Sequence, residues 1–249
     1  MFLKNYFKKI YKKRIKKLIQ KNNKKIYQER NKLINILNHD IKTPILAQIQ
    51  ALELILKNEN SDFNKNEILN EILNSNYFLY EIISNTIFLT TFENEKPKLH
   101  FENIDFINEI KDACKTINNF AKNKQQNIIF KSDNIKNIHL NADKQYIKKI
   151  LLNILSSSIS FGFENSDIEI NLEENNDTIS FYAKNKSIYM TKEKINSLLK
   201  DKKNLYDFNQ LGMNLNLNIA NKLINAHNWD IIADSQKDNS SVFGFVIKK

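Results

Sequence analysis

Two apolar seams in the first third of the chain restrict what it can fold into. Apolar residues recur at three- and four-residue steps over 33–57 and again over 68–89, which predicts two amphipathic helices. The first seam comprises Leu33, Leu37, Ile41, Ile45, Ile49, Leu52 and Leu56, and the second comprises Ile68, Ile72, Leu79, Ile82, Thr86 and Leu89. Because two helices cannot bury both seams alone, we expect a homodimer that forms an antiparallel four-helix bundle.

The pattern changes to α/β beyond a charged stretch, 93–100, which contains Pro97 and predicts a hinge. Helical periodicity and strand-like alternation then succeed one another to the end of the chain. We expect helices at 104–122, 146–161, 192–199 and 215–226, and strands at 127–131, 138–140, 167–172, 179–183, 229–233 and 241–247. The predicted organisation is a basic arm (1–32), a helical domain (33–92), the hinge and an α/β domain (101–249).

The positive charge of the chain is concentrated in the arm. Residues 1–32 contain 13 Lys or Arg and one acidic residue, whereas the remainder contains 25 Lys or Arg and 27 acidic residues. The near-neutral body argues against direct nucleic-acid binding. A basic helix of this kind can lie on an anionic membrane surface or touch nucleic acid, or it can simply extend the dimer into solvent.

Other features favour a cytoplasmic protein that is at most peripheral at the inner face of the membrane. The chain shows neither an apolar signal core nor an apolar run of about 18 residues. The single Cys114 excludes an internal disulfide framework and is expected to be a small core residue. His100, His139 and His227 are scattered, so the spacing predicts no metal site.

A histidine, an acid and a hydroxyl lie together at the start of the first seam. Residues four apart share one face of a helix, so His39 and Thr43 would stand one above the other with Asp40 beside them. A histidine beside a carboxylate can lose its proton and attack phosphorus, and a hydroxyl one turn away can position a water.

His39-Asp40-x-x-Thr43-Pro44 resembles the H box of two-component sensor histidine kinases. The resemblance runs from about residue 32 to the end of the chain. It implies a fold of the α plus α/β type, in which the four-helix dimerisation and phosphotransfer domain precedes an α/β sandwich that binds ATP. It also implies a response-regulator receiver domain as the partner.

Three family boxes that hold magnesium and ATP can be placed on the α/β domain, and each is altered. Asn153 matches the first Asn of the N box, but the metal-binding Asn falls on Ser157. Asn185 replaces the Asp that recognises adenine, and Ser187 and Tyr189 replace glycines. In the second glycine box Gly212 remains, while Asn214 and Asn216 replace glycines. We therefore expect nucleotide binding to be lost or weak.

An H box joined to altered ATP boxes favours a phosphatase acting on the aspartyl phosphate of a response regulator. By resemblance, Thr43 would hold the attacking water, His39 would shape the site and Lys42 would add positive charge, while Asp40 would serve autokinase activity. The regulator would supply its own Mg²⁺. Three alternatives stay open: a histidine phosphotransferase between receiver domains, an active kinase with atypical boxes, and a non-catalytic dimeric adaptor that sequesters a regulator.

Overall fold

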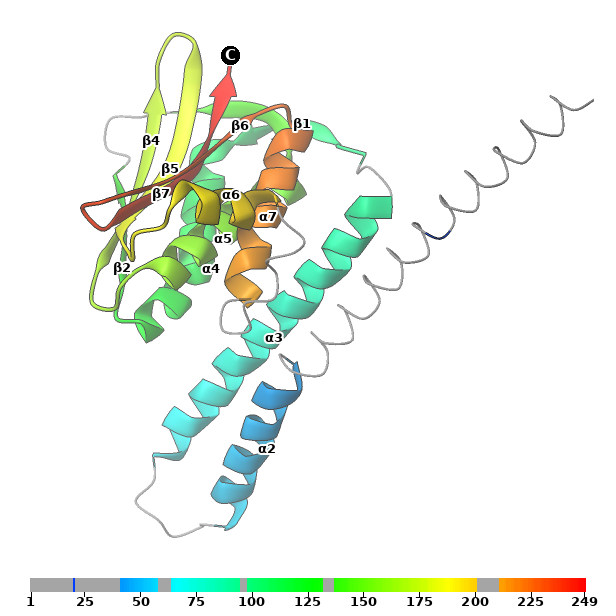
Figure 1. Cartoon of the computed structure of the whole chain (residues 1–249), viewed down its shortest axis with the longest axis vertical. Helices are drawn as coiled ribbons and strands as arrows, with labels where there is room; N and C mark the ends of the chain where they lie inside the picture. The colour runs from blue at the N-terminus through cyan, green and yellow to red at the C-terminus, as the bar shows by residue number, and fades with distance from the viewer. Residues whose placement is uncertain (1–19, 21–40, 58–63, 95–97, 132–136, 201–210) are drawn as a thin grey trace, which may run out of the picture. The chain divides into compact units, whose positions relative to one another are not determined.

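The computed structural model describes residues 20, 41–57, 64–94, 98–131, 137–200 and 211–249 (Figure 1). The chain divides into two compact units, and the division falls inside helix α3 (Lys65–Asn94), between Leu79 and Tyr80. The second unit therefore contains the C-terminal half of α3 together with everything that follows it.

The first unit contains α2 (Lys42–Lys57) and the N-terminal half of α3. The Gln48 amide donates a hydrogen bond of 2.7 Å to the Ser75 hydroxyl. No residue of α2 is buried, and its exposed large apolar residues are Ile45, Leu46, Ile49, Leu52, Leu54 and Leu56. The helical predictions are confirmed where the structure describes them, whereas 33–40 and the basic arm lie outside the described residues. The dimeric bundle stays a prediction.

A five-stranded sheet forms one layer of the second unit. Its strand order is β2-β4-β5-β7-β6, with β2 parallel to β4 and the other pairs antiparallel. The strands are β2 (Asn127–Lys131), β4 (Asp167–Glu174), β5 (Thr178–Lys186), β6 (Asp230–Gln236) and β7 (Ser240–Lys248). A separate antiparallel pair joins β1 (Phe101–Asp105) to β3 (His139–Asp143).

Helices form the second layer, against one face of the sheet (Figure 1). They are α4 (Phe106–Asn123), α5 (Lys144–Phe161), α6 (Lys192–Lys200) and α7 (Leu211–Ala226). Two aspartates cap the N-termini of the first two: Asp105 accepts from the Asn108 N–H, and Asp143 accepts from the Tyr146 N–H. The strand that precedes each helix therefore ends in the residue that starts the helix.

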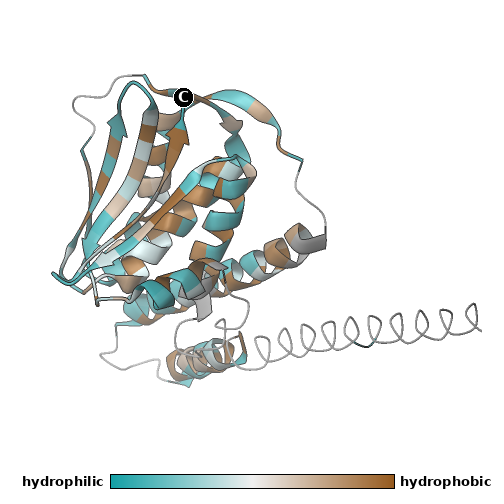
Figure 2. Ribbon diagram, turned by 45° about the horizontal axis from the view of Figure 1, so that its top comes forward, coloured by the Kyte–Doolittle hydropathy of each residue, from teal (hydrophilic) through white to brown (hydrophobic). Residues whose placement is uncertain are grey.

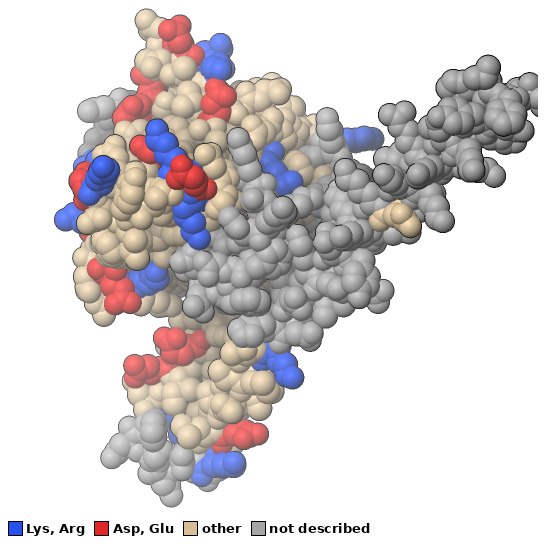
Figure 3. All heavy atoms as spheres, in the orientation of Figure 1, with Lys and Arg blue, Asp and Glu red and all other residues tan. Residues whose placement is uncertain are grey.

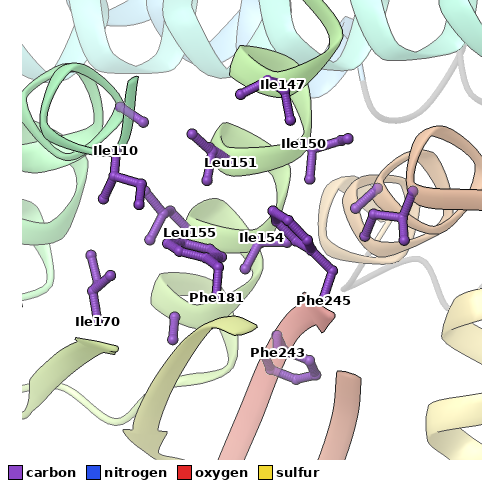
Figure 4. Packing of buried hydrophobic residues seen from close by; sticks show 14 of the residues in the cluster. Ile110, Ile147, Ile150, Leu151, Ile154, Leu155, Ile170, Phe181, Phe243 and Phe245 are labelled. Carbon is purple, nitrogen blue, oxygen red and sulfur yellow. The ribbon is translucent and has the colours of Figure 1, made fainter. Parts of the chain in front are cut away.

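Apolar side chains from both layers meet in one core. Figure 2 shows apolar faces on the helices, and Figure 4 shows Phe181, Phe243 and Phe245 of the sheet facing Ile154 and Leu155 of α5. Cys114 packs partly buried against this core, and burial raises the pKa of its thiol to about 11. The expected α/β sandwich is confirmed.

Most predicted elements of the α/β domain match the structure within a few residues. The prediction missed strand β1, and the helix expected from residue 104 begins at Phe106. Phe101 is exposed and only Ile104 of this strand is buried, so β1 lacks the alternation that identifies the other strands. The predicted hinge stays a prediction, since residues 95–97 lie outside the described ranges.

Candidate functional site

The H-box residues fall at the start of the described part of the first unit. His39 and Asp40 lie outside the described residues, whereas Lys42 and Thr43 form the first turn of α2 and are both exposed. Thr43 is therefore at a position that a partner can reach. The roles assigned to these four residues stay predictions.

Asn153, at the first N-box position, is buried in α5 and uses both atoms of its amide inside the protein. Its Nδ2 donates to the carbonyl of Lys149 at 2.7 Å. Its Oδ1 accepts from the Nδ2 of Asn85, on α3, at 3.5 Å. An amide oxygen that faces a donor in this way is not presented to a metal ion.

Ser157, which stands where the resemblance places the metal-binding Asn, is 0% exposed. Its hydroxyl donates to the carbonyl of Asn153 at 2.7 Å, and Ser158 donates likewise to Ile154 at 3.1 Å. Serine side chains inside helices commonly bond the carbonyl one turn back. Both hydroxyls thus serve the backbone of α5.

Asn185, at the position of the adenine-recognising Asp, is the centre of a closed hydrogen-bond network. Its Nδ2 donates to the carbonyl of Ser158 at 2.6 Å, and its Oδ1 accepts from the Ser241 hydroxyl at 2.6 Å. A Cβ built on Gly162 would lie 2.6 Å from Asn185 Nδ2 and 2.8 Å from Gln126 Nε2. Glycine at 162 therefore lets the network close, and Asn185 acts as a tie between α5, β5 and β7.

Ser187 follows β5 and is fully buried. Its N–H donates to the carbonyl of Asn239 at 2.8 Å, and an isolated bridge pairs it with Gly162. The neighbouring Ile188 and Tyr189 are exposed.

Gly212 lies in the first turn of α7, and Asn216, one turn later, is buried. The Oδ1 of Asn216 accepts from Asn85 Nδ2 at 2.8 Å.

Burial shifts the pKa values of two charged groups near this region, Glu81 and Lys149. Burial raises the pKa of the Glu81 carboxyl on α3, and the Lys149 ammonium partly opposes that rise. Burial likewise lowers the pKa of Lys149, and Glu81 opposes it. Glu81 of α3 and Lys149 of α5 thus influence each other's pKa electrostatically. On the face drawn in Figure 3, the described residues carry charges of both signs interspersed.

His227 directly follows α7 and has a structural role. Its Nδ1 lies 2.8 Å from the carbonyl of Leu223, and its Nε2 accepts from the backbone N–H of Asp143 at 3.3 Å. This pair of bonds requires the neutral ring with its proton on Nδ1. Burial accordingly lowers the pKa of His227, against the opposing effects of the Leu223 carbonyl and Asp143.

Among the residues that the structure describes, no group of three or more His, Cys, Asp or Glu side chains is placed to hold a metal ion. Of the helices in the described part of the chain, none carries a stretch that could span a lipid bilayer.

Sequence reasoning missed Asn85, which bonds both Asn153 of the N box and Asn216 of the second glycine box. The available signal was an asparagine inside the strongly apolar run 78–89, at a position spaced three residues from Ile82 and four from Leu89. An asparagine on the apolar face of a helix is costly unless it finds partners. That spacing could have marked it as a buried, bonded side chain.

Curated relatives of the chain are sensor kinases. The chain is 22% identical over 224 residues to the sensor protein KdpD of Clostridium acetobutylicum, covering 87% of the chain and 24% of that protein. It is 24% identical to the sensor histidine kinase YvrG of Bacillus subtilis, covering 86% of the chain and 37% of that protein. The chain thus spans well under half the length of these curated relatives. No model of a known protein family matches it.

Solved structures share the fold. The histidine kinase AdeS of Acinetobacter baumannii superposes with a TM-score of 0.59 at 17% identity, covering 84% of this chain and 97% of that one. The histidine kinase ThkA, solved in complex with the response regulator protein TrrA, gives a TM-score of 0.57 at 21% identity and covers 89% of this chain and 64% of that one. At these identities the likeness establishes the fold alone.

Proposed function

We propose that this chain, a homologue of the two-component sensor histidine kinases, acts mainly as a phosphatase of a phosphorylated response regulator. The single observation that carries the proposal is the closed network around Asn185, in which both atoms of the amide bond the protein itself. Both polar atoms at the position that would recognise adenine are therefore already bonded within the protein. Autokinase activity, which depends on ATP, is therefore the activity that we expect to be lost or weak.

The remaining nucleotide positions support the same conclusion. The Ser157 hydroxyl bonds its own helix, and the Asn153 amide is held between Lys149 and Asn85. Mg²⁺ demands near-ideal octahedral oxygen ligands and sheds its waters reluctantly. Buried groups already satisfied by the protein would have to break those bonds before they could bind it.

Dephosphorylation requires fewer groups from this chain than autokinase activity does, because it needs no bound ATP. Water attacks the phosphorus of the aspartyl phosphate, the bond from phosphorus to the aspartate oxygen breaks, and the carboxylate leaves. The regulator contributes the phosphoryl group and its Mg²⁺, so the phosphatase need only position the water in line. Thr43, exposed on the first turn of α2, is the group that we assign to that water, with His39 and Lys42 shaping the surroundings and Asp40 beside them.

A response-regulator receiver domain is the proposed partner. The supporting observation is that ThkA, whose fold this chain shares, was solved in complex with a response regulator. Exposed apolar residues on α2 would contribute to contacts with such a domain or with a second copy of the chain.

A homodimer is proposed from a second exposed stripe, which runs along α3 at three- and four-residue steps. It comprises Leu69, Leu73, Tyr77, Tyr80, Ile83 and Ile87, all of them exposed. Contiguous apolar surface of this kind marks interaction sites. Light scattering at micromolar concentration should give the mass of two chains, and a stable monomer would contradict the assembly.

The deciding experiment uses purified full-length chain and the cognate regulator phosphorylated by a small-molecule phosphodonor. Free phosphate is measured with and without Mg–ATP. We expect release that is independent of ATP, with no phosphate on the chain.

Other outcomes identify the alternatives. Acid-labile phosphate on His39, passed to a second receiver domain, would establish a phosphotransferase. Label on His39 from ATP would establish an active kinase. Tight binding of the phosphorylated regulator without phosphate release would establish an adaptor.

A further inference from the structure

Three buried asparagines join the C-terminal half of α3 to α5 and α7. The Asn85 amide nitrogen donates to Asn216 Oδ1 at 2.8 Å and, in a longer contact of 3.5 Å, to Asn153 Oδ1. All three side chains are buried. The two N–H bonds of one amide on α3 are therefore directed at the two helices that carry the altered N box and second glycine box.

The orientation of this amide cluster is determined by a backbone carbonyl. Asn153 Nδ2 donates to the carbonyl of Lys149 at 2.7 Å, and a carbonyl can only accept. Asn153 must therefore present its oxygen to Asn85, and Asn85 must present its nitrogen. A carboxylate at position 85 would face two acceptors and could not replace it.

Apolar contacts flank the cluster on the same face of α3. Ile82, one turn before Asn85, is buried. Phe88, Leu89 and Phe92, which follow it, pack against the core of the second unit. The residues 82, 85, 88, 89 and 92 thus form one helical stripe, which is distinct from the exposed stripe that includes Tyr80, Ile83 and Ile87.

Two lysines of the domain hold the aromatic side chains of this stripe. The Lys149 ammonium lies 4.7 Å from the centre of the Phe88 ring, and the Lys222 ammonium lies 5.5 Å from the centre of the Phe92 ring. The rings of Phe88 and Tyr146 also contact each other edge to face, with their centres 6.1 Å apart. Cation–π and edge-to-face contacts of this kind are attractive.

We propose that the face formed by α5 and α7 is a helix-binding site whose occupant is segment 81–92 of the same chain, held without nucleotide by the Asn85 amide. The contacts that define the site all lie within one chain and one compact unit. Asn85 donates hydrogen bonds to the side-chain oxygens of Asn153 and Asn216. By resemblance, these two positions belong to the boxes that bind magnesium and nucleotide. The surface has become a site for a protein ligand.

The amide cluster also specifies where along α3 the domain binds. A shift of one helical turn would place Leu89 or Glu81 opposite the two asparagine oxygens. Leu89 would leave both oxygens without a donor, and the Glu81 carboxylate would repel them. The apolar stripe supplies attraction, while Asn85 selects one register. This inference concerns docking alone and does not rest on the phosphatase proposal.

Hydrogen exchange of the full-length chain tests the proposal. Asn85→Ala leaves two buried oxygens without a donor, so amides 82–92 should exchange roughly ten-fold faster. Amides of α4 serve as the internal reference and should change little. The matched control is Asn76→Ala, because Asn76 is an exposed asparagine of α3 that bonds only its own helix, at Ile72; it should change exchange of 82–92 by less than about two-fold.

A second variant keeps the test decisive if Asn85→Ala folds poorly. Asn216→Ala removes the stronger acceptor and should also speed exchange of 82–92, while the double variant should be less than additive because the two residues share one bond. Additive effects, unchanged exchange of 82–92, or equal acceleration in α3 and α4 would each overturn the proposal.

The identity of the occupant is tested by mixing. Full-length Asn85→Ala and Asn216→Ala chains are combined, allowed to exchange subunits, and measured again. If α3 binds the domain of its own chain, the mixture restores no protection, because every chain lacks one partner. Restored protection of 82–92 would show that the helix comes from a second copy and would refute the intrachain site.

Discussion

Helices α2 and α5 carry the same classes of polar side chain and use them in opposite ways. In α2 no residue is buried, and Thr43 is exposed. In α5 Asn153, Ser157 and Ser158 are buried and bonded to backbone carbonyls. An exposed side chain can reach another molecule, whereas a buried one that bonds its own helix stabilises the fold.

The comparison shows how buried polar groups are accommodated in the second unit. Such groups cost free energy unless each has a partner. Ser241 and Ser158 supply partners for Asn185, and Asn85 supplies one for Asn216. Our proposal that nucleotide binding is lost or weak rests on these internal bonds.

The largest expected effect contrasts two hydroxyls. Thr43→Ala should lower phosphate release from the phosphorylated regulator by roughly 10²-fold, because a positioned water is lost. Alanine favours the helix, so the unfolding free energy should change by less than about 0.5 kcal/mol. Phosphate release and urea unfolding measure the two quantities.

Ser157→Ala is the counterpart of that change in the buried region. It should leave phosphate release within about two-fold and alter stability by about 1 kcal/mol or less, since it removes one hydrogen bond within a helix. Thr91→Ala provides an exposed control, because the Thr91 hydroxyl bonds only the carbonyl of Ile87. Equal losses of activity in Thr43→Ala and Ser157→Ala would erase the contrast.

The next largest effect is expected for Asn185→Asp, which introduces the aspartate that the resemblance places at this position. Asn185→Asp would place a carboxylate oxygen against the carbonyl of Ser158, where Asn185 now donates at 2.6 Å. We expect a loss of about 2–3 kcal/mol in unfolding free energy. Urea unfolding measures it, with Asn141→Asp, at an exposed position of β3, as the control.

Calorimetry with Mg–ATP on the same variant sharpens the result. No binding is expected, because Ser157 and Asn216 remain committed to the protein. Magnesium-dependent nucleotide binding by Asn185→Asp or by the wild type would mean that the network opens for the ligand, and the contrast between the two regions would then fail.

The smallest effect concerns pH. Burial lowers the pKa of His227 below its ordinary value of 6.5, so the neutral ring contributes stability above that value. This contribution is lost as the pH falls from 6.5 through the lower pKa of the folded state, because protonated Nε2 would face the Asp143 N–H. The free energy of unfolding should therefore decline on acidification.

His227→Gln should cost about 1 kcal/mol at pH 7.5 and flatten the acid side of the stability profile. Urea unfolding from pH 7.5 to 5 measures both variants. Phosphate release at neutral pH should be unaffected, because His227 lies outside the H box. An unchanged slope in the variant would show that another group controls the acid response.

Local pattern was enough to predict most of the elements and their order along the chain, strand β1 excepted. The period of apolar residues depends on neighbours within one or two turns, and it predicted α3, α5 and most strands to within a few residues. The resemblance assigns the altered boxes to Asn153, Asn185 and Gly212 from motif spacing alone, and that assignment stays a prediction. The apolar period and the motif spacing depend only on short stretches of the chain and not on which residues those stretches contact in the folded structure.

Only the tertiary structure decided what the polar residues do. Asn85 and Asn216 are 131 residues apart, and Asn185 and Ser241 are 56 apart, yet each pair shares a hydrogen bond. Whether an amide is free for a ligand depends on which distant atoms surround it once the layers pack. Local periodicity carries no information about those atoms. The sequence by itself determined which positions resemble the boxes, and the packing of α3, α5 and α7 determined which partners the buried amides at those positions have.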